Sequence, residues 1–172
     1  MVKEIVNVYH ETTEFTCMFP NLVETEKFQE QDTGMYSITM CFDKGDEGVK
    51  EALDENIEEA KNNDEKVANA KEPYIPIKDG DEMGKEWSAG RWVLKAKTKF
   101  KPKIVSRVGG ELNPESVNNG SICRAHIVFR PFIAGTNKGV TCSLKDLQFI
   151  SEGDGVGGGV PTFSPLDDDV PF

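Results

Sequence analysis

The chain has little of what would place it in a membrane, in a secretory pathway or around a metal ion. No run of about 18 apolar residues occurs in its 172 residues, so we expect no transmembrane helix. The opening MVKEIVNVYHETTEF lacks the apolar segment of about 7–15 residues that marks a secretory signal, and we expect a cytoplasmic protein. The cysteines form no C-x-x-C pair, which argues against a zinc or redox motif and favours reduced, buried thiols: Cys17, Cys41, Cys123 and Cys142.

Patterns that would indicate catalysis or a cofactor are equally scarce. His10 and His126 lie far apart in the sequence without a nucleophile motif, and His126 is expected to line the outer face of a sheet. GDGVGG, from Gly153, has the glycine spacing of a dinucleotide site, but GVPTFSP follows it where such a site requires a helix. DGDEMG, residues 79–84, is too short for a calcium-binding loop. We therefore expect a protein that is not an enzyme and holds no cofactor or metal.

Hydrophobic periodicity predicts a mainly β domain with one amphipathic helix. Alternating or β-branched residues indicate strands within residues 14–23, 35–42, 91–108, 121–132 and 139–150. Helical spacing predicts a helix within 45–63, with Asp46 as its cap, whereas the prolines and glycines of 71–90 indicate a long loop. These elements fit a single OB-fold-like five-stranded barrel. We assign the domain to residues 1–150, and a flexible glycine-rich linker with a disordered acidic C-terminal tail to residues 151–172.

Positive charge is concentrated in the middle of a chain whose formal net charge is −10. Residues 85–130 hold ten lysines and arginines against three glutamates, a segment charge of +7, which leaves −17 for the remainder. A basic segment within an acidic protein favours a polyanionic partner. A solvated outer strand face, or a lysine-rich edge strand that deters aggregation, would also produce such a pattern.

Strand geometry predicts that these cations share one face, because side chains two positions apart lie on the same side of a strand. From Arg91 to Lys103 the odd positions are almost all cationic, whereas Trp92 and Phe100 fall on the mostly apolar even face and are assigned to the core, with base stacking as the alternative for Phe100. In the next strand, alternate residues from Cys123 to Phe129 are expected to face inward.

Grooves for single-stranded nucleic acid combine cations that contact phosphates with aromatic rings on which bases stack. The sequence brings both kinds of residue together and has no basic helix, helix-turn-helix or zinc-finger spacing that would favour duplex DNA. Trp87, in a polar loop, is the aromatic residue best suited to stacking. We therefore expect single-stranded DNA as the partner, with these candidate binding residues: Arg91, Lys95, Lys97, Lys99, Lys101, Lys103, Arg107, Arg124, Arg130, Trp87, Tyr74 and Phe132.

The last residues, SPLDDDVPF, place three aspartates ahead of a terminal phenylalanine. The aspartates resemble a short row of phosphates, and the final ring resembles a base. Such a segment can occupy a groove built for single-stranded DNA or bind a basic, apolar pocket of another protein. The glycine-rich stretch 153–161 gives it a reach of about 15–18 Å. We expect competition with DNA and partner recruitment from these residues: Asp167, Asp168, Asp169 and Phe172.

DDDVPF is similar to the acidic, aromatic-terminated ends of bacterial and phage single-stranded DNA-binding proteins. The body resembles the phage family typified by the T7 single-stranded DNA-binding protein, through FPNLVETEKF, IPIKDGDE, SAGRWVLKAKTKFKPKIV, NNGSICRAHIVFRPF and KGVTCSLKDLQFISEGDGVGG. The resemblance implies an OB-fold and sequence-tolerant DNA binding in phage replication and recombination, in the host cytoplasm. It also implies tail contacts with replication proteins such as the DNA polymerase, and it is compatible with a homodimer. The long acidic helix region Asp46–Asn63 departs from this family.

Two further functions are compatible with the sequence. In an adaptor of the replication machinery, the basic strands would bind an acidic protein and the tail a second one. A nuclease with an unrecognised site would cleave DNA in the presence of magnesium, which neither a DNA-binding protein nor an adaptor does.

Overall fold

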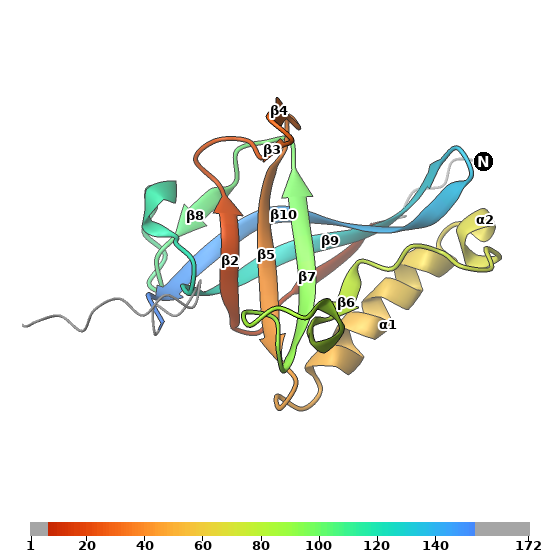
Figure 1. Cartoon of the computed structure of the whole chain (residues 1–172), viewed down its shortest axis with the longest axis horizontal. Helices are drawn as coiled ribbons and strands as arrows, with labels where there is room; N and C mark the ends of the chain where they lie inside the picture. The colour runs from red at the N-terminus through yellow and green to blue at the C-terminus, as the bar shows by residue number, and fades with distance from the viewer. Residues whose placement is uncertain (1–6, 154–172) are drawn as a thin grey trace, which may run out of the picture.

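The computed structural model describes residues 7–153, and strands make up most of its regular structure (Figure 1). The strands are β1 (Val8–Glu11), β2 (Phe15–Asn21), β3 (Lys27–Phe28), β4 (Gln31–Asp32), β5 (Tyr36–Asp43), β6 (Ile77–Asp79), β7 (Arg91–Thr98), β8 (Lys103–Val105), β9 (Ile122–Ala134) and β10 (Asn137–Ser151). The helices are α1 (Val49–Asn62) and α2 (Glu65–Ala68), with short 3-10 helices η1 (Gly80–Met83) and η2 (Pro114–Ser116). The predicted mainly β fold with one main helix is confirmed. The predicted disordered tail lies outside the described residues.

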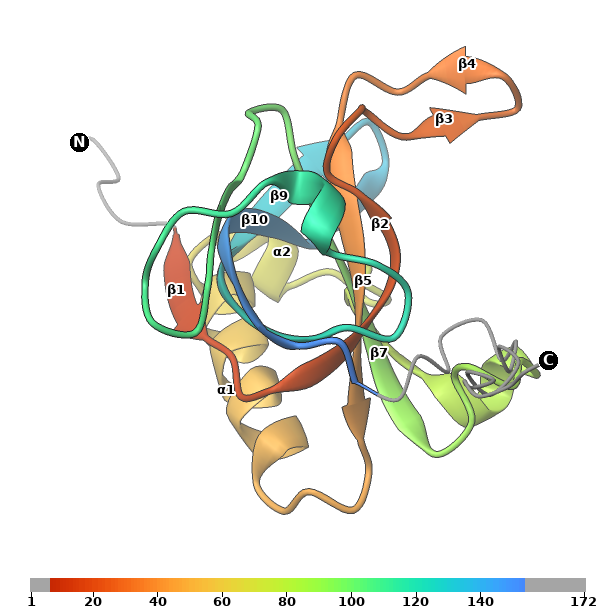
Figure 2. The ribbon, with the colours of Figure 1, turned by 90° about the vertical axis from the view of Figure 1, so that its left-hand side faces the viewer.

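Five of these strands close into a ring. β2 pairs with β5, β5 with β7, β7 with β10 and β10 with β9, and β9 returns to β2. All these pairings are antiparallel except the one between β7 and β10. In Figure 1, β2, β5 and β7 stand side by side while β9 and β10 cross them obliquely, and Figure 2 shows the β3–β4 hairpin projecting from the ring. The five-stranded arrangement is therefore the expected one.

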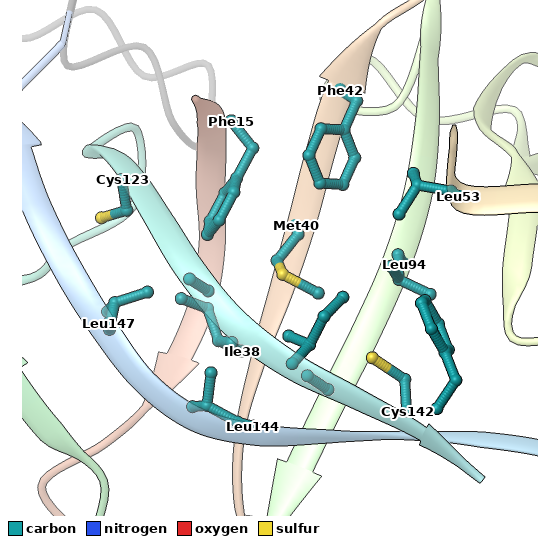
Figure 3. Close-up of a cluster of buried hydrophobic side chains, with 14 of the residues drawn as sticks. Phe15, Ile38, Met40, Phe42, Leu53, Leu94, Cys123, Cys142, Leu144 and Leu147 are labelled. Atoms are coloured by element: carbon teal, nitrogen blue, oxygen red, sulfur yellow. The ribbon is translucent and has the colours of Figure 1, made fainter. Parts of the chain in front are cut away.

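The ring encloses a core of alternate strand residues (Figure 3). Ile38, Met40 and Phe42 of β5 are almost fully buried, and the rings of Phe15 and Phe42 contact edge to face with centroids 5.5 Å apart. The inward parity expected for β9 is confirmed by four buried residues: Cys123, Ala125, Ile127 and Phe129. The core is thus built by period-two alternation, as the sequence pattern indicates.

Helix α1 packs against β1, β9 and β10. Of the five apolar residues expected at helical spacing, it buries Val49, Leu53, Ile57 and Ala60, whereas Ala52 is only partly buried. The N-cap of the helix is Gly48, whose φ of +84° suits a residue without Cβ, and no side chain in residues 7–153 caps the helix. The prediction of Asp46 as the cap is therefore wrong. The Asp46 N–H instead donates to the Asp43 carbonyl at 3.1 Å, in the turn after β5.

Two segments differ from the sequence prediction. Residues 91–108 are not one strand, because β7 ends at Thr98 and β8 begins at Lys103 beside β10. Phe100 lies in the connection between them and is 80% exposed, so its assignment to the core is wrong. Residues 71–90, expected to be a loop, contain β6 and η1, and β6 pairs with β7. None of the helices described in residues 7–153 has the length and hydropathy of a membrane span.

Candidate nucleic-acid interface

A groove of about 410 Å³ crosses the outer face of the sheet over β7. The residues of β7 alternate there: Leu94 and Ala96 point into the core, whereas Val93, Lys95 and Lys97 line the groove. The predicted outward parity of these two lysines is confirmed. We call this site the aromatic groove, and its full lining is Thr39, Tyr74, Pro76, Lys78, Met83, Trp87, Val93, Lys95, Lys97, Phe132, Thr141 and Cys142.

Tyr74 and Phe132 form one wall of the aromatic groove. The Tyr74 N–H donates to the Lys138 carbonyl at 2.8 Å, and the Tyr74 carbonyl accepts from the Val140 N–H at 2.9 Å, which fastens Tyr74 to β10. This close approach requires Gly139, because a Cβ there would lie 2.4 Å from the backbone carbonyl oxygen of Tyr74. The two rings then meet edge to face with centroids 6.2 Å apart. A tertiary contact therefore brings together two aromatic residues far apart in sequence.

Trp87 occupies a loop between η1 and β7 that is held by hydrogen bonds. Arg91 Nη1 donates to the Trp87 carbonyl at 3.0 Å, and the buried Ser88 hydroxyl donates to the Gly80 carbonyl at 2.7 Å. A Cβ on Gly80 would lie 2.0 Å from the backbone carbonyl oxygen of Ser88, so the close approach of these two segments also depends on a glycine. The indole packs against a small apolar cluster under the groove, formed by Met18, Cys41 and Val93. The loop thus holds a large aromatic ring at the groove.

The ammonium groups of the groove are only partly neutralised. Lys95 Nζ lies 2.7 Å from Glu26 Oε2, and Glu26 also accepts a hydrogen bond from Ser37 at 2.8 Å. Burial opposes ionisation of Glu26, but these hydrogen bonds and the charges of Lys95 and Lys97 outweigh it and lower the pKa of its carboxyl. Among the described residues Lys97 makes no ion pair, and the Lys78 ammonium lies 4.9 Å from the Tyr74 ring centroid. The groove therefore carries more positive than negative charge.

Other predicted residues lie at the margins of the groove. Arg130 is exposed on the outer face of β9, opposite Thr141, which lines the groove. Arg91 bonds to the Trp87 carbonyl and lies 3.4 Å from Asp43, so it supports the Trp87 loop. The exposed lysines Lys99 and Lys101 flank Phe100 in the β7–β8 connection, which continues from the end of the strand that lines the groove.

The remaining predicted cations lie in a different part of the molecule. Lys103 and Arg124 line a separate pocket of about 220 Å³ together with Glu11, His126 and Asp146, which we call the carboxylate pocket. Arg107 lies on the same side, since its carbonyl accepts from Gln148, another residue of this pocket, at 3.1 Å. The prediction of one cationic face from Arg91 to Lys103 is therefore wrong beyond Thr98. The break between β7 and β8 separates its two ends.

Charges in the carboxylate pocket are matched. Arg124 Nη2 lies 3.5 Å from Glu11, and His126 contacts Asp146 through Nδ1 at 2.6 Å and Glu11 through Nε2 at 2.8 Å. These hydrogen bonds raise the pKa of His126, and the bond from His126 together with the charge of Arg124 lowers the pKa of Glu11. His126 is exposed on the outer sheet face, as predicted. Each carboxylate here already has a cationic or imidazole partner.

Sequence reasoning missed Lys78, Met83 and Thr39 as groove residues. The first two lie in residues 71–90, which were expected to be a loop. The signal that could have found β6 is the alternation of Ile75 and Ile77, both packed against the core. Lys78, the next residue, is then expected on the opposite, outward face.

Cys142 lines the groove, but thiol chemistry is not expected there. All four are free and buried, as predicted, and burial is the main cause that raises the pKa of Cys41 to about 11 and of Cys123 to about 12. Thiols with such pKa values are not nucleophiles near neutral pH. In residues 7–153, no group of three or more His, Cys, Asp or Glu residues is placed to hold a metal ion.

Comparison with known proteins gives one family and several solved structures. The family model for the Enterobacter phage Enc34 ssDNA-binding protein matches residues 11–169. The structure of that phage's single-stranded DNA-binding protein in complex with ssDNA has a TM-score of 0.73 and 23% identity, and the match covers 91% of this chain and 89% of that one. The structure of a C-terminal truncation of the same protein has a TM-score of 0.71 and 24% identity, and the match covers 83% of this chain and 86% of that one.

A more distant structure has the same fold. Gp2.5, a single-stranded DNA-binding protein encoded by bacteriophage T7, is 13% identical with a TM-score of 0.61, and the match covers 95% of this chain and 97% of that one. None of the curated protein sequences matches significantly. The resemblance to phage single-stranded DNA-binding proteins is confirmed, and the matching family and structures are described as ssDNA-binding proteins, in agreement with the expectation of a binding protein. The chain belongs to the family of the Enterobacter phage Enc34 ssDNA-binding protein.

Proposed function

We propose that the protein binds single-stranded DNA of any sequence through the aromatic groove, in phage DNA replication and recombination in the host cytoplasm. One observation carries the proposal: Lys95 and Lys97 lie on the same sheet face as the rings of Tyr74, Trp87 and Phe132. Rings stack on every base, and ammonium groups contact phosphates irrespective of sequence. The family membership supports the same partner.

Phosphates should bind at cations that have no carboxylate partner or that can exchange this partner for a phosphate. Lys97, Lys78 and Arg130 make no ion pair among the described residues, and a phosphate would replace Glu26 as the partner of Lys95. If roughly four phosphate contacts form, the logarithm of the association constant for DNA should fall with the logarithm of the salt concentration, with a slope of about −3. Lys99 and Lys101 extend the path along the β7–β8 connection, with Phe100 exposed between them. In this proposal residues 1–150 form the binding domain.

Tryptophan fluorescence tests the proposal. A base stacked on Trp87 should quench its emission as oligo-dT is added, and the quenching should saturate. Trp92 supplies a constant background, because it packs against the core under the ammonium groups of Lys44 and Lys50, 4.5 and 4.7 Å from its ring centroid. The control variant Trp87→Phe should bind DNA without the quench. An adaptor that binds only proteins would show no saturating change, and that result would overturn the proposal.

We further propose that residues 151–172 act as a tail whose Asp167, Asp168, Asp169 and Phe172 compete with DNA and recruit replication proteins such as the DNA polymerase. The acidic cluster supports the competition, because it would enter a groove with excess positive charge. Deleting residues 164–172 should tighten DNA binding at low salt and abolish capture of the polymerase. Phe172→Ala should weaken the polymerase contact more than the competition. Unchanged DNA affinity after the deletion would contradict the competition.

A homodimer is a further prediction from the family resemblance. Light scattering of the full chain, with and without oligo-dT, measures its mass directly. A mass of one 19.1 kDa chain at all concentrations would contradict the homodimer.

A further inference from the structure

Phe19 has a backbone conformation that a phenylalanine rarely adopts. Its φ is +50°, in the left-handed region where a Cβ is unfavourable. It lies in β2 where the pairing with β5 shifts register, between Met18 and Asn21. Such a bulge re-aims side chains away from the regular strand alternation. The position would suit glycine, so the presence of an aromatic ring must be understood from its surroundings.

The conformation of Phe19 is held by two side-chain amides, one from a separate loop and one from β2 itself. The Phe19 N–H donates to Asn119 Oδ1 at 2.6 Å, and the Phe19 carbonyl accepts from Asn21 Nδ2 at 3.3 Å. Asn119 belongs to the connection between η2 and β9, which lies beside β2 (Figure 2). Two side-chain amides therefore fix the bulge and the direction of the ring.

The ring points to solvent and to the aromatic groove. Phe19 is 45% exposed, and its ring meets Trp87 edge to face with centroids 5.0 Å apart. Trp87 lines the aromatic groove, whose far wall is Phe132 and Tyr74. The four rings therefore follow one path across the outer face of the sheet, from β2 to β10.

Beyond Phe19 this path opens into a trough of about 730 Å³ between residues 19–27 and the loop 114–119. Its charged lining residues are Glu24, Lys27 and Glu115, and Lys27 already lies 3.6 Å from Glu24. The excess carboxylate disfavours phosphates there. Asn118 and Thr25 offer groups that hydrogen-bond to base edges.

We infer that Phe19 is a fourth stacking platform, and that a strand leaving the aromatic groove past Trp87 places a base on Phe19 and in this trough while its phosphates stay outside. The inference rests on the proposed single-stranded DNA binding. It lengthens the binding site by the nucleotides that reach the trough, and it gives a reason for a strained aromatic residue to be exposed at the bulge.

Two substitutions at one position separate stacking from stability. Phe19→Gly removes the ring and suits φ of +50°, whereas Phe19→Ala removes the ring and keeps the strain. Both should weaken binding of long oligo-dT about tenfold, the size expected for one lost stacking contact. Neither should change the salt slope. Thermal unfolding should show the glycine variant to be the more stable of the two.

A length series of oligo-dT, from about 4 to 16 nucleotides, locates the effect. The shortest oligonucleotides that the wild type binds should bind Phe19→Gly equally well, and only longer ones should bind it more weakly. Tyr9→Ala, which removes an exposed aromatic ring of β1 outside both the groove and the trough, should bind every length like the wild type. Wild-type affinity of Phe19→Gly at all lengths, or an equal loss with Tyr9→Ala, would overturn the inference. A wild-type protein that binds no oligo-dT would instead overturn the proposed function.

Discussion

The aromatic groove and the carboxylate pocket are both built from outward-facing basic residues of the same sheet, yet they differ in what surrounds the charge. In the groove, Lys95 pairs with Glu26 while Lys97 makes no ion pair among the described residues, and three aromatic rings line the same space. In the pocket, Arg124 and His126 are bonded to carboxylates, and none of the described residues that line it is a phenylalanine, tyrosine or tryptophan. Cations mark a nucleic-acid site when they lack carboxylate partners and lie beside stacking surfaces. A count of basic residues along the sequence does not make this distinction.

Equal losses of positive charge in the aromatic groove and in the carboxylate pocket should affect DNA affinity differently. Lys95→Ala with Lys97→Ala should weaken oligo-dT binding about 10–100-fold at about 50 mM salt and reduce the salt slope by about 1.4, the loss of two phosphate contacts. The same variant leaves Glu26 without its cation, which adds repulsion. Fluorescence anisotropy at several salt concentrations measures both quantities. The control, Lys103→Ala with Arg124→Ala, removes equal charge and should change affinity less than about threefold.

Removing a ring should separate stacking from charge. Tyr74→Ala or Phe132→Ala should each weaken binding by about 1–3 kcal/mol and leave the salt slope unchanged. Their combined effect should be less than additive, because the two rings contact each other. Tyr74→Phe keeps the ring and serves as the control, with nearly wild-type affinity. A salt slope altered by Tyr74→Ala would show that the ring acts by positioning cations.

Gly139→Ala should damage the groove indirectly. The added Cβ would lie 2.4 Å from the Tyr74 oxygen, so the backbone that fastens Tyr74 to β10 must shift, at a cost of about 1–3 kcal/mol in unfolding free energy. DNA affinity should fall, but by no more than in Tyr74→Ala. Gly45→Ala is the control, since a Cβ there meets nothing within 4 Å. Thermal unfolding and anisotropy of both variants are the measurements, and a Gly139→Ala protein identical to the wild type would contradict this account of Tyr74.

The carboxylate pocket should respond to pH while DNA binding does not. Hydrogen bonds to Glu11 and Asp146 raise the pKa of His126, so its charged form stabilises the fold below the unfolded-state pKa of about 6.5. That contribution is lost as pH rises through the folded-state pKa. The Tm difference between wild type and His126→Gln should therefore shrink as pH increases from about 6 to 9. His10, whose burial lowers its pKa, is present in both proteins and cancels. Oligo-dT affinity should be the same for both.

Local periodicity accounts for what could be predicted from the sequence. Alternation along eight residues of β7 predicted that Lys95 and Lys97 face outward and Leu94 and Ala96 inward, because this parity depends only on the strand itself. The same argument failed for Phe100, since the strand ends at Thr98 where β8 leaves to pair with β10. The residue at which a strand ends depends on its pairing with other strands, and the alternation of residues along the strand gives no information about that pairing.

The convergence of the aromatic residues needed the folded structure. Tyr74 reaches Phe132 only because Gly139 admits its backbone, and Trp87 is held by Ser88 bonded to Gly80. These contacts join segments distant in sequence, so no local pattern predicts them. Lys103 and Arg124 also keep the outward parity predicted for them, but β8 and the far end of β9 carry them to another part of the surface.

Photocrosslinking would show directly whether bases stack on the rings of the aromatic groove. An oligo-dT carrying 5-iodouracil, bound to the full chain and irradiated, should crosslink to aromatic residues that stack on its bases, and mass spectrometry identifies the peptides. The account predicts crosslinks to peptides that contain Tyr74, Trp87 and Phe132, the three rings of the groove. Crosslinks confined to the segments around Lys103 and Arg124, with none at these rings, would contradict it.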